Sequence, residues 1–276
     1  TTPGMFVTTI TQGYDCDGAM MLTASHLPPE RNGIKFFTKE GGASKKDITN
    51  LIEMAATAYE QRSSKYLDLV QHNKSDKVHS VDFLQVYAKI LADKIRSGVN
   101  HKQHYDTPLK GYKIIVDAGN GAGGFFATQV LEPLGADITG SQFLEPDGTF
   151  PNHVPNPEDA AAMDATIQAT LDSKADMGIV FDTDVDRSAI VSNTGESINR
   201  NKLIALLAAI VIREAKSMGI TSKINIVTDS VTSLGLKSFI EKRGGVHFRY
   251  KRGYKNVIDK ALELNAQGTY TPLAIE

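Results

Sequence analysis

A short apolar segment that leads directly into three alternating aspartates constrains this chain more than any other feature. Residues 177–181 read Met-Gly-Ile-Val-Phe, typical of a buried β-strand, and Asp182, Asp184 and Asp186 follow at once. Loops at the carboxyl ends of strands line the ligand crevice of open α/β sheets. If this loop is extended, its three carboxylates point the same way and repel one another unless a hard divalent cation neutralises them. The sequence therefore predicts an α/β fold with a cation site beside this strand.

Several interpretations of the acidic loop stay open. Arg187, which ends the run, carries a guanidinium suited to a phosphate or a carboxylate. The simplest alternative is a solvated acidic turn. A calcium-binding EF-hand fits poorly, because Arg187 and Asn193 stand where that loop needs a glycine and an acid. A magnesium-dependent phosphatase of the haloacid dehalogenase type, with Asp182 as its nucleophile, is a better rival.

The rest of the chain alternates between strand and helix patterns. Alternating or continuous apolar residues predict further strands at residues 20–23, 34–37, 113–117, 136–143, 189–191, 224–227 and 246–250. Helical spacing predicts helices at residues 48–60, 82–95, 159–171, 201–216 and 234–242, and one that ends at residue 134. We expect Asp47 to be the N-cap of the first of these helices. This order predicts α/β layers in three units, at residues 1–100, 110–216 and 222–276.

Composition narrows the classes of partner. The 276 residues carry a net charge of −2, so we expect neither nucleic acid nor a membrane as a partner. The longest apolar stretch, residues 203–212, is too short to cross a bilayer. A single cysteine excludes an internal disulfide and favours a reducing compartment, the cytoplasm or an organelle stroma. Both ends look cut, so we expect any targeting segment to lie outside the chain. The oligomeric state is left open.

A second candidate site lies in the polar loop between the first two predicted strands. Ser25 and His26 are neighbours there, and a serine on a tight loop beside a histidine can act as a nucleophile. Lys35, on the following strand, can supply positive charge or a base. A Ser-His pair alone more often marks a turn, and no order of residues typical of a hydrolase triad is recognisable.

A glycine-rich turn offers a competing function. Residues 119–124 match the G-x-G-x-x-G pattern of dinucleotide sites and follow a predicted strand. The acidic residue expected about 20 positions further on, here Glu145, lies in a Pro-rich segment and does not end a strand. A tight strand-to-helix turn is therefore the simpler interpretation.

The two candidate loops together match a known family. Residues 23–28 read Thr-Ala-Ser-His-Leu-Pro, and residues 32–35 read Asn-Gly-Ile-Lys. With the acidic loop 182–187, they are similar to the phosphoserine loop and metal loop of the α-D-phosphohexomutases, the superfamily of phosphoglucomutases and phosphomannomutases. Residues 116–123 and 145–158 resemble parts of that family's second domain. Residues 252–257 look like its third-domain loop that helps to choose the sugar orientation.

The resemblance implies tandem mixed-sheet α/β domains, with the first and third incomplete. It implies an isomerase, an intramolecular phosphotransferase that interconverts hexose 1-phosphate and hexose 6-phosphate through a phosphoserine and a hexose 1,6-bisphosphate. Mg²⁺ would be the cofactor, with Ser25, Asp182, Asp184 and Asp186 as its ligands. The catalytic residues would be Ser25, His26 and Lys35, with the general base left open between the last two. The residues that contact substrate would be Arg187, Gly253, Tyr254 and Lys255.

Two departures from the family pattern favour a further alternative, a non-catalytic relative that binds sugar phosphates. Leu27 stands where the family has Asn, and Thr183 where it has Gly. A Cβ at position 183 would make a left-handed backbone costly there. The family's phosphate-gripping fourth domain has no counterpart, so we expect the chain alone to be inactive. Which hexose phosphate is the substrate is left open.

Overall fold

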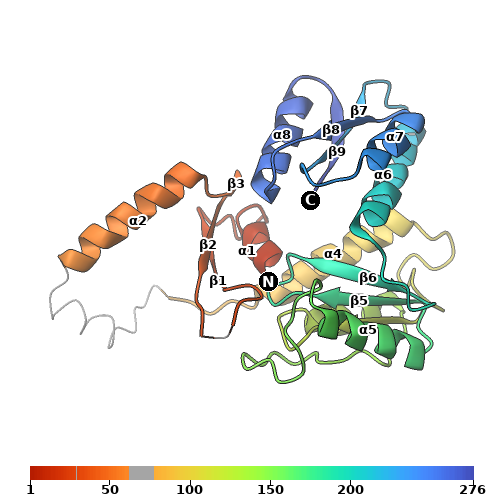
Figure 1. Ribbon diagram of the computed structural model, residues 1–276, viewed down its shortest axis with the longest axis horizontal. Helices are drawn as coiled ribbons and strands as arrows, with labels where there is room; N and C mark the ends of the chain where they lie inside the picture. The colour runs from red at the N-terminus through yellow and green to blue at the C-terminus, as the bar shows by residue number, and fades with distance from the viewer. Residues whose placement is uncertain (29, 62–77) are drawn as a thin grey trace. The chain divides into compact units, whose positions relative to one another are not determined.

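The structure, a computed structural model, describes residues 1–28, 30–61 and 78–276 (Figure 1). They form two compact units, Thr1–Glu196 and Ser197–Glu276. Unit 1 contains, in chain order, α1 (Thr2–Thr8), β1 (Ala19–Leu22), β2 (Ile34–Thr38), β3 (Gly41–Gly42), α2 (Lys45–Glu60), α4 (Phe83–Val99), β4 (Ile114–Asp117), the π-helical η1 (Phe126–Leu131), the 3₁₀ turn η2 (Glu132–Leu134), α5 (Ala160–Asp172), β5 (Met177–Phe181) and β6 (Ser188–Ser192). Unit 2 contains α6 (Arg200–Ser217), β7 (Ile224–Thr228), α7 (Leu234–Lys242), β8 (Val246–Arg249), α8 (Tyr254–Ala266) and β9 (Tyr270–Ile275).

The first sheet of unit 1 is antiparallel, in the order β1-β2-β3, and α1 packs against β1 and β2. The chain then enters α2 through a capping box. The Ser44 side chain accepts a bond from the Asp47 backbone N–H, and the Asp47 side chain accepts one from the Ser44 N–H. The prediction of Asp47 as N-cap is therefore wrong by three positions, because Ser44 satisfies the free N–H group and Asp47 supports it from the first turn.

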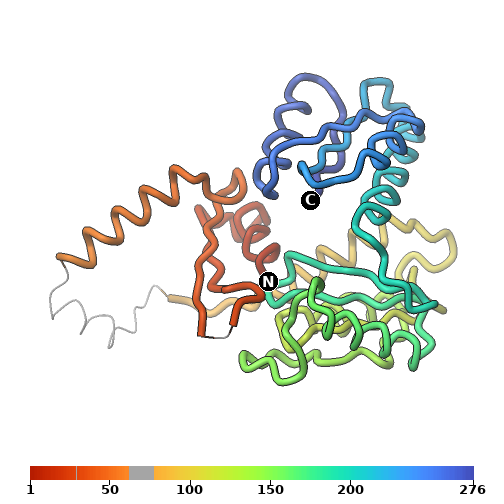
Figure 2. Tube along the Cα trace, in the orientation of Figure 1, coloured from red at the N-terminus to blue at the C-terminus, as the bar shows by residue number. Residues whose placement is uncertain are grey.

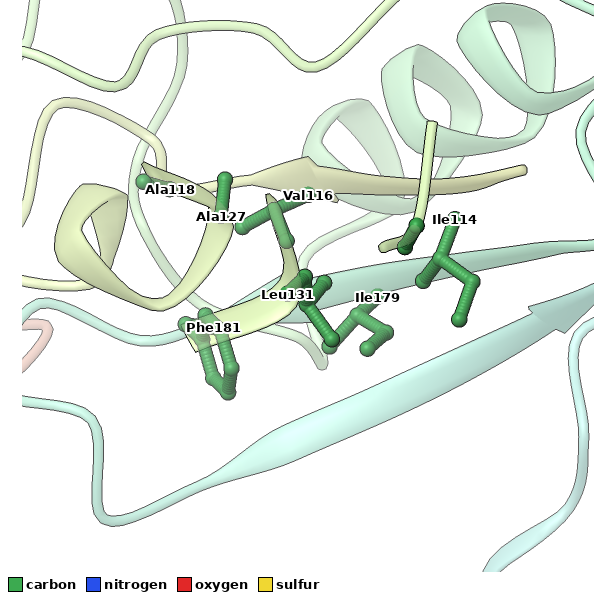
Figure 3. Packing of buried hydrophobic residues seen from close by; sticks show 8 residues of the cluster. Ile114, Val116, Ala118, Ala127, Leu131, Ile179 and Phe181 are labelled. Carbon is green, nitrogen blue, oxygen red and sulfur yellow. The ribbon is translucent and has the colours of Figure 1, made fainter. Parts of the chain in front are cut away.

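The second sheet of unit 1 is mixed, in the order β4-β5-β6, with β4 parallel and β6 antiparallel to β5. Alternate residues of β4 and β5 face a core that η1 closes, and Figure 3 shows how they pack. That core contains Ile114, Val116, Ala118, Ala127, Leu131, Ala136, Ile179 and Phe181. Helix α4 covers η1 and η2 from outside.

The opposite face of this sheet packs on α5. Gly178 of β5 lies against Thr166 and Thr170 of α5, which leaves no room for a side chain. Asp117, at the end of β4, is fully buried on the same face, where it accepts a hydrogen bond from the Thr166 hydroxyl. The sheet therefore has a layer on each side, and its carboxyl-terminal edge carries the loops after β4 and β5.

Unit 2 has three layers, with helices on both faces of a parallel sheet in the order β8-β7-β9. Ile224 and Ile226 of β7 face a core with α6 and α7, while Val227 faces a core with α8. Figure 2 traces the chain from α6 through this sheet to β9, where it ends. The alternation of strand and helix that the sequence predicted is therefore confirmed, including the mixed sheet of unit 1.

The structure differs from the predicted elements in several places. Residues 136–143 form no continuous strand and make only isolated bridges at Asp137 and Gln142. The helix that ends at Leu134 is a π-helical turn followed by a 3₁₀ turn. Helices α1 and α8 and strands β3 and β9 have no counterpart among the predicted elements. Within the described residues, no helix combines the length and the apolar character that crossing a bilayer requires.

Helix α6 packs against β7, β9 and α7, so it belongs to the core of unit 2. The division between the two units falls between Glu196 and Ser197. The predicted unit at residues 110–216 instead includes this helix. The predicted three-unit boundaries stay a prediction, and the packing of α6 favours an earlier start for the last unit.

Candidate functional site

The acidic loop is the turn of the β5–β6 hairpin. The hairpin register pairs Phe181 with Ser188, so the six residues between them form the loop. The Asp182 N–H donates to the Arg187 carbonyl at 3.1 Å, and the Val185 N–H donates to the Asp182 carbonyl at 3.2 Å. Val185 has φ of 65°. The premise of an extended loop is therefore wrong: the three carboxylates converge because the backbone turns.

The glycine-rich turn after β4 supports this loop. The Ala122 N–H donates to the Thr183 carbonyl at 2.8 Å. A Cβ on Gly121 would lie 2.8 Å from the Thr183 Cα and from its carbonyl oxygen. Glycine is required there because the two backbones are in contact. Gly119 has φ of 54°, and a Cβ on Gly124 would lie 2.0 Å from the Leu144 carbonyl oxygen, so packing and backbone conformation explain all three glycines without a dinucleotide. Thr183 itself does not have a positive φ, so the expected cost of its Cβ does not arise.

The serine loop connects β1 and β2, whose last pair is Leu22 and Ile34. The Thr23 N–H donates to the Gly33 carbonyl at 3.0 Å and closes the loop. The Ser25 N–H donates to the Thr23 hydroxyl at 2.9 Å, and Ser25 has a left-handed φ of 55°. The nucleophile candidate therefore lies on a tight turn in a conformation that few non-glycine residues adopt.

The two loops meet at Ser25, although they are far apart in the sequence. The Ser25 hydroxyl donates to Asp182 Oδ2 at 3.2 Å. The Arg187 guanidinium donates to the same Asp182 oxygen at 2.9 Å and to Ser25 Oγ at 2.6 Å. A hydroxyl, a carboxylate and a guanidinium thus form one connected group.

The other two catalytic candidates lie in the same group. Lys35 Nζ donates to Asp184 Oδ2 at 2.7 Å and to Asp186 Oδ2 at 2.6 Å. Arg187 donates to His26 Nδ1 at 2.6 Å. Because arginine has no acceptor, this contact requires Nδ1 of His26 to be unprotonated. Neither Lys35 nor His26 is free of partners in this arrangement.

Burial and charge act differently on the aspartates. Burial raises the pKa of Asp182 to about 6, and the neighbouring carboxylates of Asp186 and Asp184 add to that rise. Burial also opposes the ionisation of Asp184, but hydrogen bonds from Lys35 and Thr2 outweigh it and hold the Asp184 pKa below its ordinary value. The pKa of Lys35 is raised, because its bonds to Asp184 and Asp186 outweigh its own burial.

The donor set fits a metal ion. One oxygen from each of Asp182, Asp184 and Asp186 lies within 4.8 Å of the others. Asp182 and Asp184 are buried, and Asp184 Oδ1 has no hydrogen-bond partner. A buried carboxylate oxygen without a donor is costly unless a cation faces it. The three aspartates can therefore hold a metal ion.

The remaining substrate-contact candidates lie in unit 2. Gly253 has φ of 113° and its N–H donates to the Glu276 carboxylate at 2.9 Å. Tyr254 is 47% exposed, and Lys255 Nζ donates to Asp259 one helical turn away at 3.1 Å. The expected contacts of these residues with substrate stay a prediction.

Thr2 also belongs to the site and is not among the residues predicted from the sequence. Its hydroxyl donates to Asp184 Oδ2, and its N–H donates to the Asp184 carbonyl at 2.8 Å. No sequence signal could have linked the two residues, because 182 positions separate them and Thr2 lies in no recognisable motif.

Comparison with known proteins places the chain in a family. Models of three successive domains match it, namely the α/β/α domains I, II and III of phosphoglucomutase/phosphomannomutase at residues 1–63, 86–195 and 199–270. The chain is 32% identical over 247 residues to the phosphomannomutase/phosphoglucomutase of Pseudomonas aeruginosa, covering 90% of this chain and 47% of that protein. It is 29% identical over 265 residues to the phosphoglucosamine mutase of Caldicellulosiruptor saccharolyticus, covering 95% and 54%.

A solved structure agrees in fold. The phosphoglucomutase/phosphomannomutase family protein of Burkholderia thailandensis superposes with a TM-score of 0.67 at 24% identity, over 94% of this chain and 50% of that one. The chain belongs to the α-D-phosphohexomutase superfamily. It spans about half the length of the curated relatives that it matches.

Proposed function

We propose that the natural protein is a phosphohexomutase, which interconverts hexose 1-phosphate and hexose 6-phosphate through a phosphoserine at Ser25. The observation that carries this proposal is the contact between the Ser25 hydroxyl and Asp182 at 3.2 Å, across 157 positions of sequence. A nucleophile beside a metal-binding carboxylate group is what phosphoryl transfer requires, since positioning and charge stabilisation supply most of its catalysis.

Mg²⁺ suits the site as the cofactor. Asp182, Asp184 and Asp186 would hold it together with an oxygen of the phosphorylated Ser25. Magnesium prefers oxygen ligands and accepts a few carboxylates together with a phosphate. When bound, it would neutralise charge that develops on the transferring oxygens. The unpartnered Asp184 Oδ1 supports a cation at this position.

The residues around Ser25 have distinct roles in this proposal. When the phosphoryl group leaves Ser25 for a sugar hydroxyl, the Ser25 oxygen gains negative charge, and the Arg187 guanidinium already donates to that oxygen at 2.6 Å. The sugar hydroxyl's proton would pass to His26 or to Lys35. Lys35 would first have to lose a proton, because its bonds to Asp184 and Asp186 raise its pKa. His26 would have to release Nδ1 from Arg187 or accept through the other ring nitrogen, so the base is left open between the two. The hexose 1,6-bisphosphate then reorients and returns its other phosphoryl group to Ser25.

Recognition of the sugar would fall to unit 2. Gly253 ends the connection after β8, and Tyr254 and Lys255 begin α8. This connection lies at the carboxyl-terminal edge of a parallel sheet, where α/β proteins bind ligands. The relatives include phosphomannomutase/phosphoglucomutase and phosphoglucosamine mutase by name, so glucose, mannose and glucosamine phosphates are the substrates to compare.

The test is the turnover of a phosphate label on Ser25. The natural full-length protein is incubated with ³²P-labelled glucose 1,6-bisphosphate and Mg²⁺, and the modified residue is located by mass spectrometry. We expect label on Ser25 that is lost when unlabelled glucose 1-phosphate or mannose 1-phosphate is added, and no label in Ser25→Ala.

Two outcomes would favour the rival functions. A phosphatase that uses Asp182 would keep its activity in Ser25→Ala and would carry an acyl phosphate. The structure offers little support for it, because both Asp182 carboxylate oxygens accept bonds from Arg187. A non-catalytic relative would bind the sugar phosphate and never exchange label at Ser25.

A further inference from the structure

Asp184 is held by a residue outside both loops. Thr2, in the first turn of α1, is buried, and its N–H donates to the Asp184 carbonyl at 2.8 Å. Its hydroxyl donates to Asp184 Oδ2. Thr2 therefore binds both the backbone and the side chain of one aspartate, and the start of α1 meets the β5–β6 turn (Figure 1).

These bonds leave the two oxygens of the Asp184 carboxylate unequal. Oδ2 accepts from the Thr2 hydroxyl and from Lys35 Nζ, whereas Oδ1 is buried without a partner. Carboxylate rotation would break both bonds at Oδ2, so the direction of Oδ1 is fixed. That oxygen is the one left available to a cation.

Thr2 is better suited than Lys35 to fix this direction. The Lys35 side chain is partly exposed, long and shared with Asp186. Thr2 is β-branched, which restricts its side chain, and its neighbour Thr1 caps the helix by accepting a bond from the Gly4 N–H at 3.1 Å. The backbone of α1 therefore fixes the position of the Thr2 hydroxyl, whereas Lys35 reaches Asp184 through a long, flexible side chain.

We propose that Thr2 is a positioning residue that presents Asp184 Oδ1 to the divalent cation of the site. The proposal rests on the metal site of the proposed function and adds a residue that lies outside the acidic loop. Partners that orient a ligating carboxylate typically change metal affinity by about 10- to 100-fold when they are removed.

The experiment measures Mn²⁺ affinity by electron paramagnetic resonance of the free ion, in the full chain. Thr2→Val removes the hydroxyl and keeps the shape, and we expect it to weaken Mn²⁺ binding by about 10-fold or more. Thr2→Ser keeps the hydroxyl and should retain wild-type affinity. The matched control is Thr8→Val, because Thr8 is also buried in α1 but its hydroxyl donates to the Met5 carbonyl of the same helix. This control should bind Mn²⁺ as the wild type does.

A second measurement needs no variant and remains decisive if Thr2→Val fails to fold. Hydrogen exchange of residues 1–8 is followed in the wild-type chain with and without Mg²⁺, and we expect Mg²⁺ to slow it. Equal Mn²⁺ affinity in Thr2→Val and the wild type, or exchange that Mg²⁺ leaves unchanged, would overturn the role of Thr2. A wild-type chain that binds no divalent cation would instead overturn the metal site of the proposed function.

Discussion

Ser25 and Val185 have left-handed backbones, with φ of 55° and 65°, on the two loops that meet at the site. A positive φ is unusual for any residue with a Cβ and is a strong outlier for a β-branched one. Such conformations persist where the surroundings determine them, and they gather at functional sites. Here the Thr23 side chain holds Ser25, and the turn closed by Asp182 holds Val185.

A second single residue, His153, is expected to make the stability of the chain depend on pH. Its Nε2 lies 3.0 Å from the buried Asp117 carboxylate, and its Nδ1 lies 3.0 Å from the Val154 carbonyl. Both partners are acceptors, so both ring nitrogens must carry protons. The hydrogen bond to Asp117 accordingly raises the pKa of His153 against the opposing effect of burial.

Because the pKa of His153 is raised in the folded state, His153 contributes fully to the free energy of unfolding at pH values below its unfolded pKa, about 6.5. That contribution is lost as the pH rises through the folded pKa. We expect His153→Gln to lower the free energy of unfolding by about 1.5–3 kcal/mol at pH 6. The difference from wild type should shrink towards pH 9, as measured by denaturant unfolding at each pH. A difference that stays constant with pH would contradict the charged pair.

Single residues also mark the limit of prediction from sequence. The motifs around Ser25 and Asp182 carry local signals, so their closeness could be predicted through a family resemblance. Thr2 and the Asp117–His153 pair carry no such local signal, because only the folded chain brings Thr2 to Asp184 and His153 to Asp117. The positive φ at Val185 could not be predicted either, because the family pattern pointed to a left-handed backbone at Thr183.

Among the elements, the glycine-rich turn after β4 is the support on which the acidic loop depends. We expect Gly121→Ala to destabilise the chain by about 1–3 kcal/mol, because the new Cβ would overpack against the Thr183 backbone. It should also weaken Mn²⁺ binding by moving the loop. The control is Gly148→Ala, where a Cβ meets nothing within 4 Å and φ is not positive. Equal metal affinity in the two variants would show that the turn does not position the loop.

Elements with their own pattern were predictable, and elements defined by packing were not. Strands β4, β5 and β7 read as apolar runs because both faces of their sheets are covered. Residues 136–143 have no such run, because polar residues and a glycine interrupt the apolar ones, and they make only isolated bridges beside β4. Helix α8 has a polar sequence whose three buried residues, Val257, Ala261 and Leu264, form a narrow stripe that is easily missed.

For the whole molecule, we expect Mg²⁺ to act on unit 1 alone. The candidate ligands Ser25, Asp182, Asp184 and Asp186 all lie in unit 1. A ligand at 100 times its Kd stabilises the state that binds it by about 2.7 kcal/mol. We therefore expect Mg²⁺ to slow hydrogen exchange in β1, β2, β5 and β6 and to leave β7 unchanged. Protection that extends equally through β7 would contradict a site confined to unit 1.

In the proposed mechanism Ser25 and the three aspartates share one cation, and ³¹P electron–nuclear double resonance can detect this shared ion. The natural full-length protein is phosphorylated on Ser25 with glucose 1,6-bisphosphate, confirmed by mass spectrometry, and loaded with Mn²⁺ in place of Mg²⁺. We expect a ³¹P hyperfine coupling typical of a phosphate oxygen bound to Mn²⁺, and no such coupling in Ser25→Ala. Bound Mn²⁺ without ³¹P coupling in the phosphorylated protein would show that the phosphoserine and the aspartates do not share the ion.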